Sequence, residues 1–371
     1  MNVPTPMIYA HIGDLHITSA KEQNYIDLLS IIAQIETECS NKLDFVYLPG
    51  DNADNGLPEQ YQLIATALKM LSIPVHIITG DHDMEQGSLA NFYHTLPAQQ
   101  LPKALNIKGI NCLFLDVCGP GSGGPDFRLG KPQAEWLTSH LENAKSNDQK
   151  TVVFTHTYPA DLKDSNEARL LNNVLYANDV LLVDMGHTHY NDLANNGKTI
   201  FAATRSTGQI EEGPVGYSLV SVDNGSVGWR FKPLHDAFPF VMITSPADHR
   251  LQPDSLPQQN EFIEVHAVVF GRRTVKQVKC RADKQEWTIM TLCEDKITWA
   301  AQITHTDASA LTVMATDESG RPGIHTIELR GASNHQPKRI CNGSDADSIG
   351  VWPENGIFGT QLGPNSNGKP S

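Results

Sequence analysis

The chain has 371 residues, of which 40% are hydrophobic and 19% charged, the composition of an ordinary globular protein. Its length favours two domains, and its formal net charge of −14 argues against a nucleic-acid-binding surface, which would be basic. No apolar segment approaches the roughly 20 residues of a membrane helix, and residues 1–10 lack the charged start of a secretion signal. We therefore expect a cytoplasmic protein that binds neither a membrane nor a nucleic acid polymer.

Six scattered cysteines without a Cys-x-x-Cys pair predict buried thiols rather than a disulfide framework. Cys280 with Cys293 is the one pair to test as a disulfide. The other four are Cys39, Cys112, Cys118 and Cys341.

The first part of the chain alternates strand-length apolar runs with amphipathic helical segments. From residue 199 the apolar period changes to two, and Asp223-Asn224-Gly225 is typical of a hairpin turn. We expect an α/β domain over 1–235, a sandwich of sheets flanked by helices. Strands are predicted over 7–12, 45–48, 75–79, 110–117, 151–154, 180–185, 199–203, 217–222 and 226–231, and helices over 21–38, 58–70, 88–96, 131–144 and 167–177.

Helical periodicity disappears after a predicted linker at 233–239. Short runs separated by turn residues predict an all-β domain over 236–331, a sandwich of immunoglobulin-like or fibronectin-like type. The segment 332–371 is rich in Ser, Asn, Gly and Pro, but it contains Trp352, Ile357 and Phe358, so we expect it to dock, on the first domain. The seven runs are 240–243, 261–270, 274–280, 287–292, 298–303, 311–316 and 323–330.

Acidic residues and histidines follow five of the predicted strands. The carboxyl ends of strands in an open α/β sheet meet at one edge, where ligands bind, so these side chains are expected to converge. Carboxylates with imidazoles and no thiolate suit Mn, Fe or Zn, and Asp51 is the best placed to bridge two cations. The residues are Asp14, His16, Asp51, Asp81, His82, His156, His187 and His189.

These segments together resemble the motif set of the calcineurin-like metallophosphoesterases, over about residues 7–205. The run Gly50-Asp51-Asn52-Ala53-Asp54-Asn55-Gly56-Leu57-Pro58-Glu59-Gln60-Tyr61 is most similar to the class III cyclic-nucleotide phosphodiesterases and the related glycerophosphodiesterases. The resemblance implies a calcineurin-like αββα sheet sandwich. The motifs are Gly13-Asp14-Leu15-His16, Gly50-Asp51-Asn52, Gly80-Asp81-His82-Asp83, Thr155-His156-Thr157 and Gly186-His187-Thr188-His189.

The resemblance also implies two metal ions and roles for single residues. Two divalent or mixed-valence ions would share a bridging hydroxide that attacks the phosphorus of a small phosphodiester. His82 would assist the leaving group, and Asp83 is a candidate to orient it. Metal 1 would be held by Asp14, His16, Asp51 and His189, and metal 2 by Asp51, Asp81, His156 and His187.

Asp81 departs from the family pattern, which has asparagine at this position. The added negative charge predicts tighter retention of metal 2 and a weaker pull on an anionic substrate. Alternatively, Asp81 is not a ligand and the second metal site is weak.

Three other questions stay open from the sequence. The activity could be that of a phosphomonoesterase or nucleotidase, or the first domain could be a non-catalytic metal-bound scaffold whose β-sandwich binds a partner. The C-terminal part could mediate homo-oligomerisation, restrict access to the cleft, or only solubilise. His11 is expected in the core, and Arg128 and Arg205 are expected on the surface or facing the phosphate.

Overall fold

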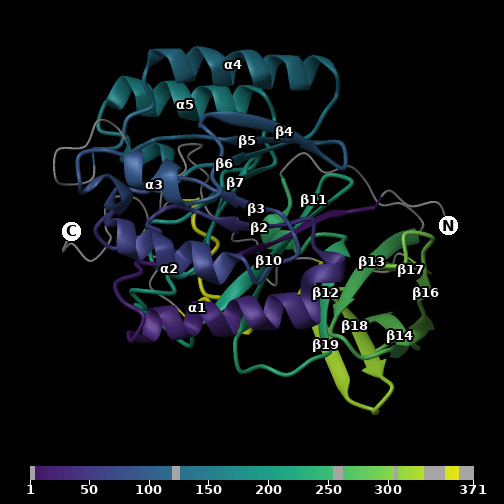
Figure 1. Ribbon diagram of the computed structural model, residues 1–371. Coiled ribbons are helices and arrows are strands. Elements are labelled where there is room, and N and C mark those ends of the chain that lie inside the picture. The colour runs from purple at the N-terminus through teal and green to yellow at the C-terminus, as the bar shows by residue number, and fades with distance from the viewer. Residues whose placement is uncertain (1–4, 119–125, 254–261, 305–307, 330–346, 359–371) are drawn as a thin grey trace.

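The computed structural model describes residues 5–118, 126–253, 262–304, 308–329 and 347–358. Its larger part consists of two β-sheets packed face to face, with helices on both outer sides (Figure 1). This order of helix, sheet, sheet and helix is the one that the sequence predicts.

The first sheet contains the N-terminal strands in the order β11-β10-β1-β2-β3. Strands β1, β2 and β3 run parallel, and β10 pairs antiparallel with β1. Helices α1 and α2 cover the outer face, where Leu28 and Ile64 share a core with Val46 of the sheet. The elements are β1 Met7–His11, α1 Gln23–Gln34, β2 Phe45–Leu48, α2 Pro58–Leu68, β3 Val75–Ile77, α3 Ala90–Thr95, β10 Gly216–Asp223 and β11 Ser226–Pro233.

The second sheet has the order β4-β5-β6-β7-β9-β8, and its strands β5, β6, β7 and β9 are parallel. Helices α4 and α5 cover it through Leu137, Leu141 and Leu171, which pack with Val153 and Val183. The elements are β4 Lys103–Ile107, β5 Ile110–Phe114, α4 Lys131–Ser146, β6 Thr151–Phe154, α5 Ser165–Ala177, β7 Leu182–Met185, β8 Asp192–Asn195 and β9 Ile200–Ala203.

Two strands of this sheet, β4 and β8, were not predicted from the sequence. Strand β4 forms a hairpin with β5 through Lys108 and Gly109, which have positive φ of 49° and 85°, and no Asn-Gly or Asp-Gly pair marks this turn. Strand β8 is polar at both ends, yet it is buried because Asp192 accepts a hydrogen bond from the Tyr158 hydroxyl and Asn195 donates to backbone carbonyls. Tertiary contacts, rather than an apolar pattern, make it a strand.

Aromatic side chains fill the space between the two sheets. The Tyr9 and Phe45 rings stack with centroids 4.7 Å apart, and the Phe114 and Phe154 rings stack at 4.4 Å. Within this core, the carboxylate of Asp184 on β7 accepts hydrogen bonds from two residues of β1: the Tyr9 hydroxyl at 2.5 Å and His11 Nδ1 at 2.8 Å. These contacts hold β1 against β7, and His11 is fully buried as expected.

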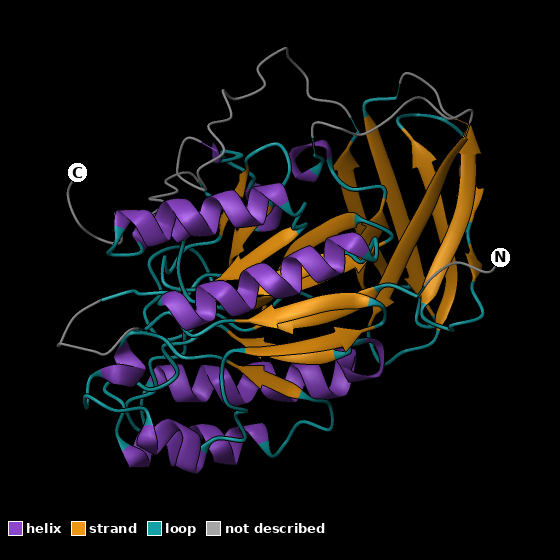
Figure 2. Ribbon diagram, turned by 90° about the horizontal axis from the view of Figure 1, so that it is seen from above, coloured by secondary structure: helices purple, strands orange, loops and turns teal. Residues whose placement is uncertain are grey.

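The strands after residue 239 form two further four-stranded sheets that enclose a core of their own (Figure 2). The predicted strand at 287–292 is split. Its first half pairs with one sheet and its second half with the other, on either side of buried Met290. The all-β character is as expected, whereas an immunoglobulin-like type and a domain boundary at 236 stay predictions. The strands are β12 Phe240–Ser245, β13 Phe262–Phe270, β14 Val275–Ala282, β15 Thr288–Ile289, β16 Thr291–Leu292, β17 Thr298–Thr304, β18 Ala310–Asp317 and β19 Pro322–Glu328.

Residues 347–358, the described part of the predicted tail, lie against the first part of the chain. Ser348 forms a bridge with Ala194 of β8, and Trp352 and Ile357 are buried in the core between the two large sheets. The buried guanidinium of Arg205 donates to the carbonyl oxygens of Glu212, Pro214 and Gly356. The prediction that Arg205 is on the surface or faces the phosphate was therefore wrong.

The five described cysteines are buried free thiols, which confirms that prediction for all except Cys341, a residue outside the described ranges. Arg128 is partly exposed and pairs with Glu167, as a surface arginine does. None of the helices in the described ranges has the length and apolar character to span a membrane.

The Trp352→Ala substitution tests the docking of the C-terminal segment. Trp352 is 5% exposed and its ring lies 4.4 Å from the Arg250 guanidinium, so its truncation is expected to lower the free energy of unfolding by about 3 kcal/mol. Val351, 54% exposed on the same segment, is the matched control, and Val351→Ala should change stability by less than about 0.5 kcal/mol. The measurement is urea unfolding followed by fluorescence and circular dichroism, and equal effects of the two substitutions would contradict the packing described.

Candidate metal centre

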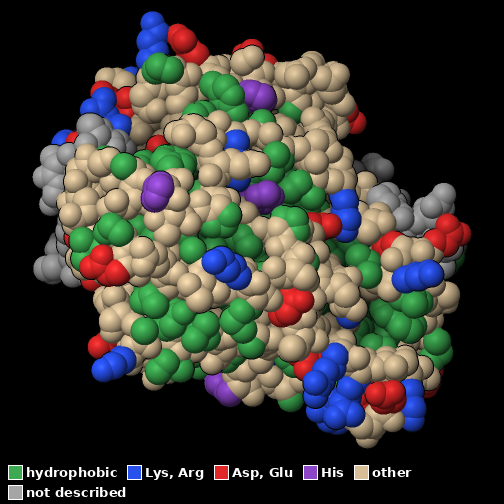
Figure 3. Space-filling view, in the orientation of Figure 1, with side chains coloured by type: hydrophobic (Ala, Val, Ile, Leu, Met, Phe, Trp, Pro, Cys, Tyr) green, Lys and Arg blue, Asp and Glu red, His purple; other side chains and the backbone are tan. Residues whose placement is uncertain are grey.

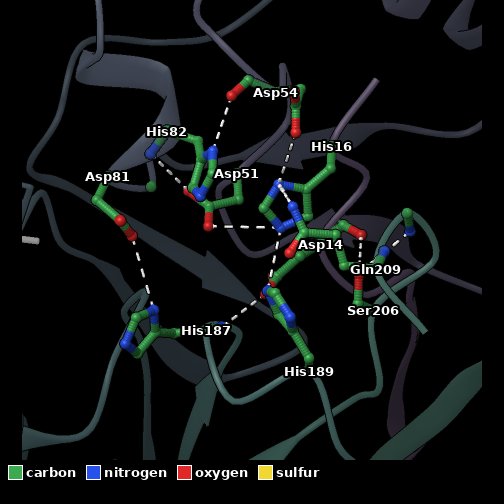
Figure 4. A network of polar contacts seen from close by, with 12 residues as sticks. Asp14, His16, Asp51, Asp54, Asp81, His82, His187, His189, Ser206 and Gln209 are labelled. Atoms are coloured by element: carbon green, nitrogen blue, oxygen red, sulfur yellow. Dashed lines mark hydrogen bonds and ion pairs between the residues drawn. The ribbon is translucent and has the colours of Figure 1, made fainter. Parts of the chain in front are cut away.

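Both large sheets deliver polar side chains to one edge, at the carboxyl ends of their parallel strands. In the first sheet, Asp14 and His16 follow β1, Asp51 follows β2, and Asp81 and His82 follow β3. In the second, His156 follows β6, and His187 and His189 follow β7. The structure brings all seven predicted ligands together. Figure 4 shows six of them, all except His156, together with His82. That they bind metal ions stays a prediction.

The seven residues form two groups that share Asp51. In each group, one ligand atom per residue lies within 4.8 Å of all the others. The Oδ2 atom of Asp51 lies 3.7 Å from His16 Nε2 and 3.4 Å from His156 Nε2, so this oxygen faces both groups. The groups are Asp14, His16, Asp51 and His189, and Asp51, Asp81, His156 and His187. Each offers the mixed oxygen and nitrogen donors that suit Mn, Fe or Zn.

Two features of the first group fit a cation. Asp14 Oδ1 is buried and, among the described residues, has no hydrogen-bond partner. The Nε2 atoms of His16 and His189 are 3.1 Å apart. A buried carboxylate oxygen without a partner is costly. The two imidazole nitrogens are close enough to share a proton as donor and acceptor, or to direct both lone pairs at one positive ion. The residues present therefore suit a metal ion at this position.

Four of the seven residues have left-handed backbone conformations. The φ angles are 41° for His16, 47° for Asp51, 65° for His187 and 62° for His189. Non-glycine residues rarely adopt this region, and such strain persists where the surroundings enforce it, often at functional sites. Here the backbone NH groups of Leu15 and His16 both donate to the carbonyl oxygen of Asp51, which ties the first two motifs together.

Two motif glycines allow carboxylates to approach the backbone. A Cβ atom on Gly80 would lie 2.1 Å from Asp51 Oδ1, and one on Gly186 would lie 2.2 Å from Asp14 Oδ1. A backbone NH just after each glycine donates to the same carboxylate: His82, two residues after Gly80, to Asp51 Oδ1 at 2.9 Å, and His187, directly after Gly186, to Asp14 Oδ2 at 2.7 Å. A side chain at either glycine would displace a candidate ligand.

Backbone carbonyls set the tautomers of two histidines. His156 Nδ1 lies 2.8 Å from the Pro49 carbonyl oxygen, and His82 Nδ1 lies 2.7 Å from that of Asp54. A carbonyl oxygen only accepts, so Nδ1 carries the proton in both rings. The Nε2 atom of His156 then remains for Asp51 and Asp81, at 3.4 and 3.3 Å.

Burial and mutual charge shift the pKa values in this cluster. Burial lowers the pKa of His187 to about 4 and of His189 to about 3, so both are neutral and able to donate a lone pair. Burial also raises the pKa of Asp14, to about 6. For His82, burial lowers the pKa, but the Asp51 carboxylate and the Asp54 carbonyl outweigh it and raise the value to about 8. The carboxylates of the centre thus lie beside two neutral imidazoles, His187 and His189, whereas the Asp51 carboxylate raises the pKa of His156 despite the burial of that ring.

Asp83 differs from its expected role beside His82. Its buried carboxylate accepts hydrogen bonds from the backbone NH groups of Gly80, Asn52 and Ala53, from the Asn52 side chain and from the Tyr61 hydroxyl. It therefore joins the loop after β2 to the loop after β3, and the Asp54 carbonyl orients His82 instead.

Sequence reasoning missed two residues that support the centre. The Ser206 hydroxyl donates to the Asp14 carbonyl oxygen, and the Gln209 side chain lies 3.2 Å from His16 Nδ1. Both follow β9, whose carboxyl end lies at the same edge, so the rule that found the other candidates also applies to this strand.

Comparisons with known proteins agree with this site. A family model described as calcineurin-like phosphoesterase matches residues 7–191. A probable cyclic nucleotide phosphodiesterase of Coxiella burnetii is 26% identical over 211 residues, which cover 53% of this chain and 82% of that protein. A glycerophosphodiester phosphodiesterase of Enterobacter lignolyticus is 28% identical over 203 residues, 49% of this chain and 71% of that protein.

Among solved structures, a dimetal phosphatase from Danio rerio aligns with 62% of this chain and 97% of its own, at 12% identity and a TM-score of 0.48. The matched residues 7–191 include all seven clustered side chains and all five motifs. The chain belongs to the calcineurin-like phosphoesterases and is a hydrolase of phosphoric esters.

Proposed function

We propose that this protein hydrolyses small phosphodiesters, of the cyclic-nucleotide or glycerophosphodiester type, with two metal ions and with His82 at the leaving group. The observation that carries this proposal is the shared position of Asp51 between two groups of carboxylates and imidazoles, with the His82 ring beside it. The names of the similar proteins support a diester substrate.

The proposed reaction assigns the residues two roles, binding the ions and positioning the loops. Asp51 would hold both ions, with Asp14, His16 and His189 on one side and Asp81, His156 and His187 on the other. When bound, such a pair of ions supplies positive charge to the phosphoryl oxygens and lowers the pKa of water. The Asp83 network and the Asp54 carbonyl fix the loops and the ring on which this arrangement depends.

His82 suits the role of donor to the leaving oxygen. Its Nδ1–H donates a hydrogen bond to the Asp54 carbonyl oxygen, and its ring packs edge-on against His16 with centroids 4.5 Å apart. Its side chain is 28% exposed, which leaves the Nε2 atom accessible to a bound ester. A proton or hydrogen bond from Nε2 would stabilise the charge that develops as the ester bond breaks.

The preference for diesters is tested with bis(p-nitrophenyl) phosphate and p-nitrophenyl phosphate, each with added Mn²⁺. We expect a kcat/KM at least about tenfold higher for the diester. The Asp51→Asn variant provides the background rate, and Asp164→Asn, which preserves the N-terminal cap of α5 and changes none of the candidate ligands, is the folding control. A higher kcat/KM for the monoester would favour a phosphatase, and a metal-loaded protein inactive on both would favour a scaffold.

The His82→Ala variant tests the leaving-group role. We expect kcat to fall by about 10²-fold or more for a diester with an alkyl leaving group, because a poor leaving group needs the donor. The loss should be smaller for p-nitrophenolate, and KM and metal content should change little. Stopped assays with both substrates and elemental analysis give these values. Loss of metal from the variant, or equal loss of rate on both substrates, would contradict the role.

The Asp81→Asn variant tests the charge of the second group. Asp81 Oδ1 lies 3.3 Å from His156 Nε2 and 3.6 Å from His187 Nδ1. Removal of its negative charge should weaken binding of one of the two ions by about tenfold or more, and should lower KM for an anionic diester because repulsion decreases. Metal titration and steady-state kinetics measure both. If metal affinity and KM are both unchanged, Asp81 neither binds the ion nor sets the charge of the centre.

A further inference from the structure

A groove separate from the metal centre lies where the edge strands of the two large sheets meet. It has a volume of about 570 Å³ and is bounded by α2, β3, the segment after α3, and the start of β4. Figures 1 and 3 view the molecule from the side on which β3 and β4 lie close together, and hydrophobic side chains gather on this face. The volume is in the range of small-molecule sites.

Seven of the twelve residues that line the groove are apolar, and the polar ones are Lys69, His76, Thr95, Gln99 and Lys103. Leu68, Ile73, Leu96 and Pro97 line it together with His76 of β3 and Lys103 of β4. Lys103 is 9% exposed, so its ammonium group is largely removed from water.

Lys103 is a buried cation without a carboxylate partner in the described part of the chain. Its Nζ atom lies 3.5 Å from His76 Nδ1 and 4.6 Å from the centre of the Phe114 ring, and none of the ion pairs among the described residues includes it. Burial lowers the pKa of Lys103 to about 8, which still leaves the ammonium protonated at pH 7. A buried ammonium that has only an imidazole and a ring near it is poorly compensated.

The contact with Lys103 determines the protonation state of His76 in the groove. An ammonium group only donates, so His76 Nδ1 accepts and its proton is on Nε2. His76 is therefore neutral, and burial followed by the charge of Lys103 lowers its pKa to about 4. Apart from the exposed Lys69 at its rim, the groove offers one buried positive charge, that of Lys103, which matches a monoanion better than a phosphate dianion.

We propose that this groove binds a small apolar monocarboxylate, with its carboxylate on Lys103 and its hydrocarbon part against Leu68, Ile73, Leu96 and Pro97. The charge of the ligand would complement a cation that has no carboxylate partner among the described residues, and its apolar part would cover the apolar wall of the groove. This site is independent of the metal centre and of the reaction proposed for it.

The test is isothermal titration of the metal-loaded protein with butanoate, hexanoate and octanoate. We expect affinity to rise by up to about fourfold for each added methylene as more apolar surface is buried. Octan-1-ol, which lacks the charge, and inorganic phosphate, which lacks the apolar part, should each bind at least about tenfold more weakly than octanoate.

Variants locate the binding and separate it from the metal centre, which could also attract a carboxylate. Lys103→Gln should weaken octanoate binding at least about tenfold. Lys69→Gln, at an exposed lysine on the rim of the same groove, should change it less than twofold. Circular dichroism and turnover of bis(p-nitrophenyl) phosphate confirm that each variant is folded.

Three outcomes would overturn the proposal. They are no saturable binding of octanoate to the parent protein, equal affinity for octanoate and octan-1-ol, and equal affinity of the parent and Lys103→Gln for octanoate. The comparison of octanoate with octan-1-ol needs only the parent protein, so the proposal can be rejected even if the variant does not fold.

Discussion

The alignment of two separate sheets is the constraint on which the rest of the structure depends. The first sheet supplies the three carboxylates and His16, and the second supplies three imidazoles, so neither sheet alone contains a complete group. Asp184 sets this alignment in the core, because it accepts hydrogen bonds from Tyr9 and His11 across the space between the sheets. The Tyr47 hydroxyl adds bonds to the carbonyls of Thr155 and Asp184. A buried pair of this kind is costly to break and therefore resists sliding of one sheet over the other.

The same edge concentrates charge that the fold must hold against repulsion. Asp51 shares one group with Asp14 and the other with Asp81, and the buried carboxylate of Asp83 accepts from the backbone NH of Asn52, the residue after Asp51. Backbone NH groups of His82, His187, Gly80 and Ala53 donate to the carboxylates of Asp51, Asp14 and Asp83 and offset part of this repulsion. The left-handed backbone of the ligand residues and the glycines that lie close to the carboxylates place these NH groups in position. Negative charge remains at this cluster, in a chain whose net charge is −14, and it favours the binding of cations.

The sequence predicts those parts of this structure that depend on residues close together in the chain. Strand ends followed by Asp or His could be found because apolar runs and motif glycines are consecutive in the chain, and all seven side chains meet as expected. Strand β8 could not be found, because the partners that bury Asp192 and Asn195 are far away in sequence. Arg205 was misplaced for the same reason, since its carbonyl partner at Gly356 is 151 residues away. Asp83 was assigned to the nearest histidine, whereas the fold connects it to Asn52 and Tyr61.

The all-β part is packed against the first part through a continuous apolar surface. Phe240 and Met242 of β12, with Val268 of β13, belong to the same buried cluster as Leu28 of α1 and Leu219 of β10. A polar contact accompanies this packing, where Asp223 accepts hydrogen bonds from Thr244 and from His266. Because β10 pairs directly with β1, whose carboxyl end leads to Asp14, any shift of the β-sheets at this surface acts on the strand that positions a candidate ligand. The C-terminal part is thus mechanically connected to the centre through the first sheet, and its packing contributes to keeping that sheet in place.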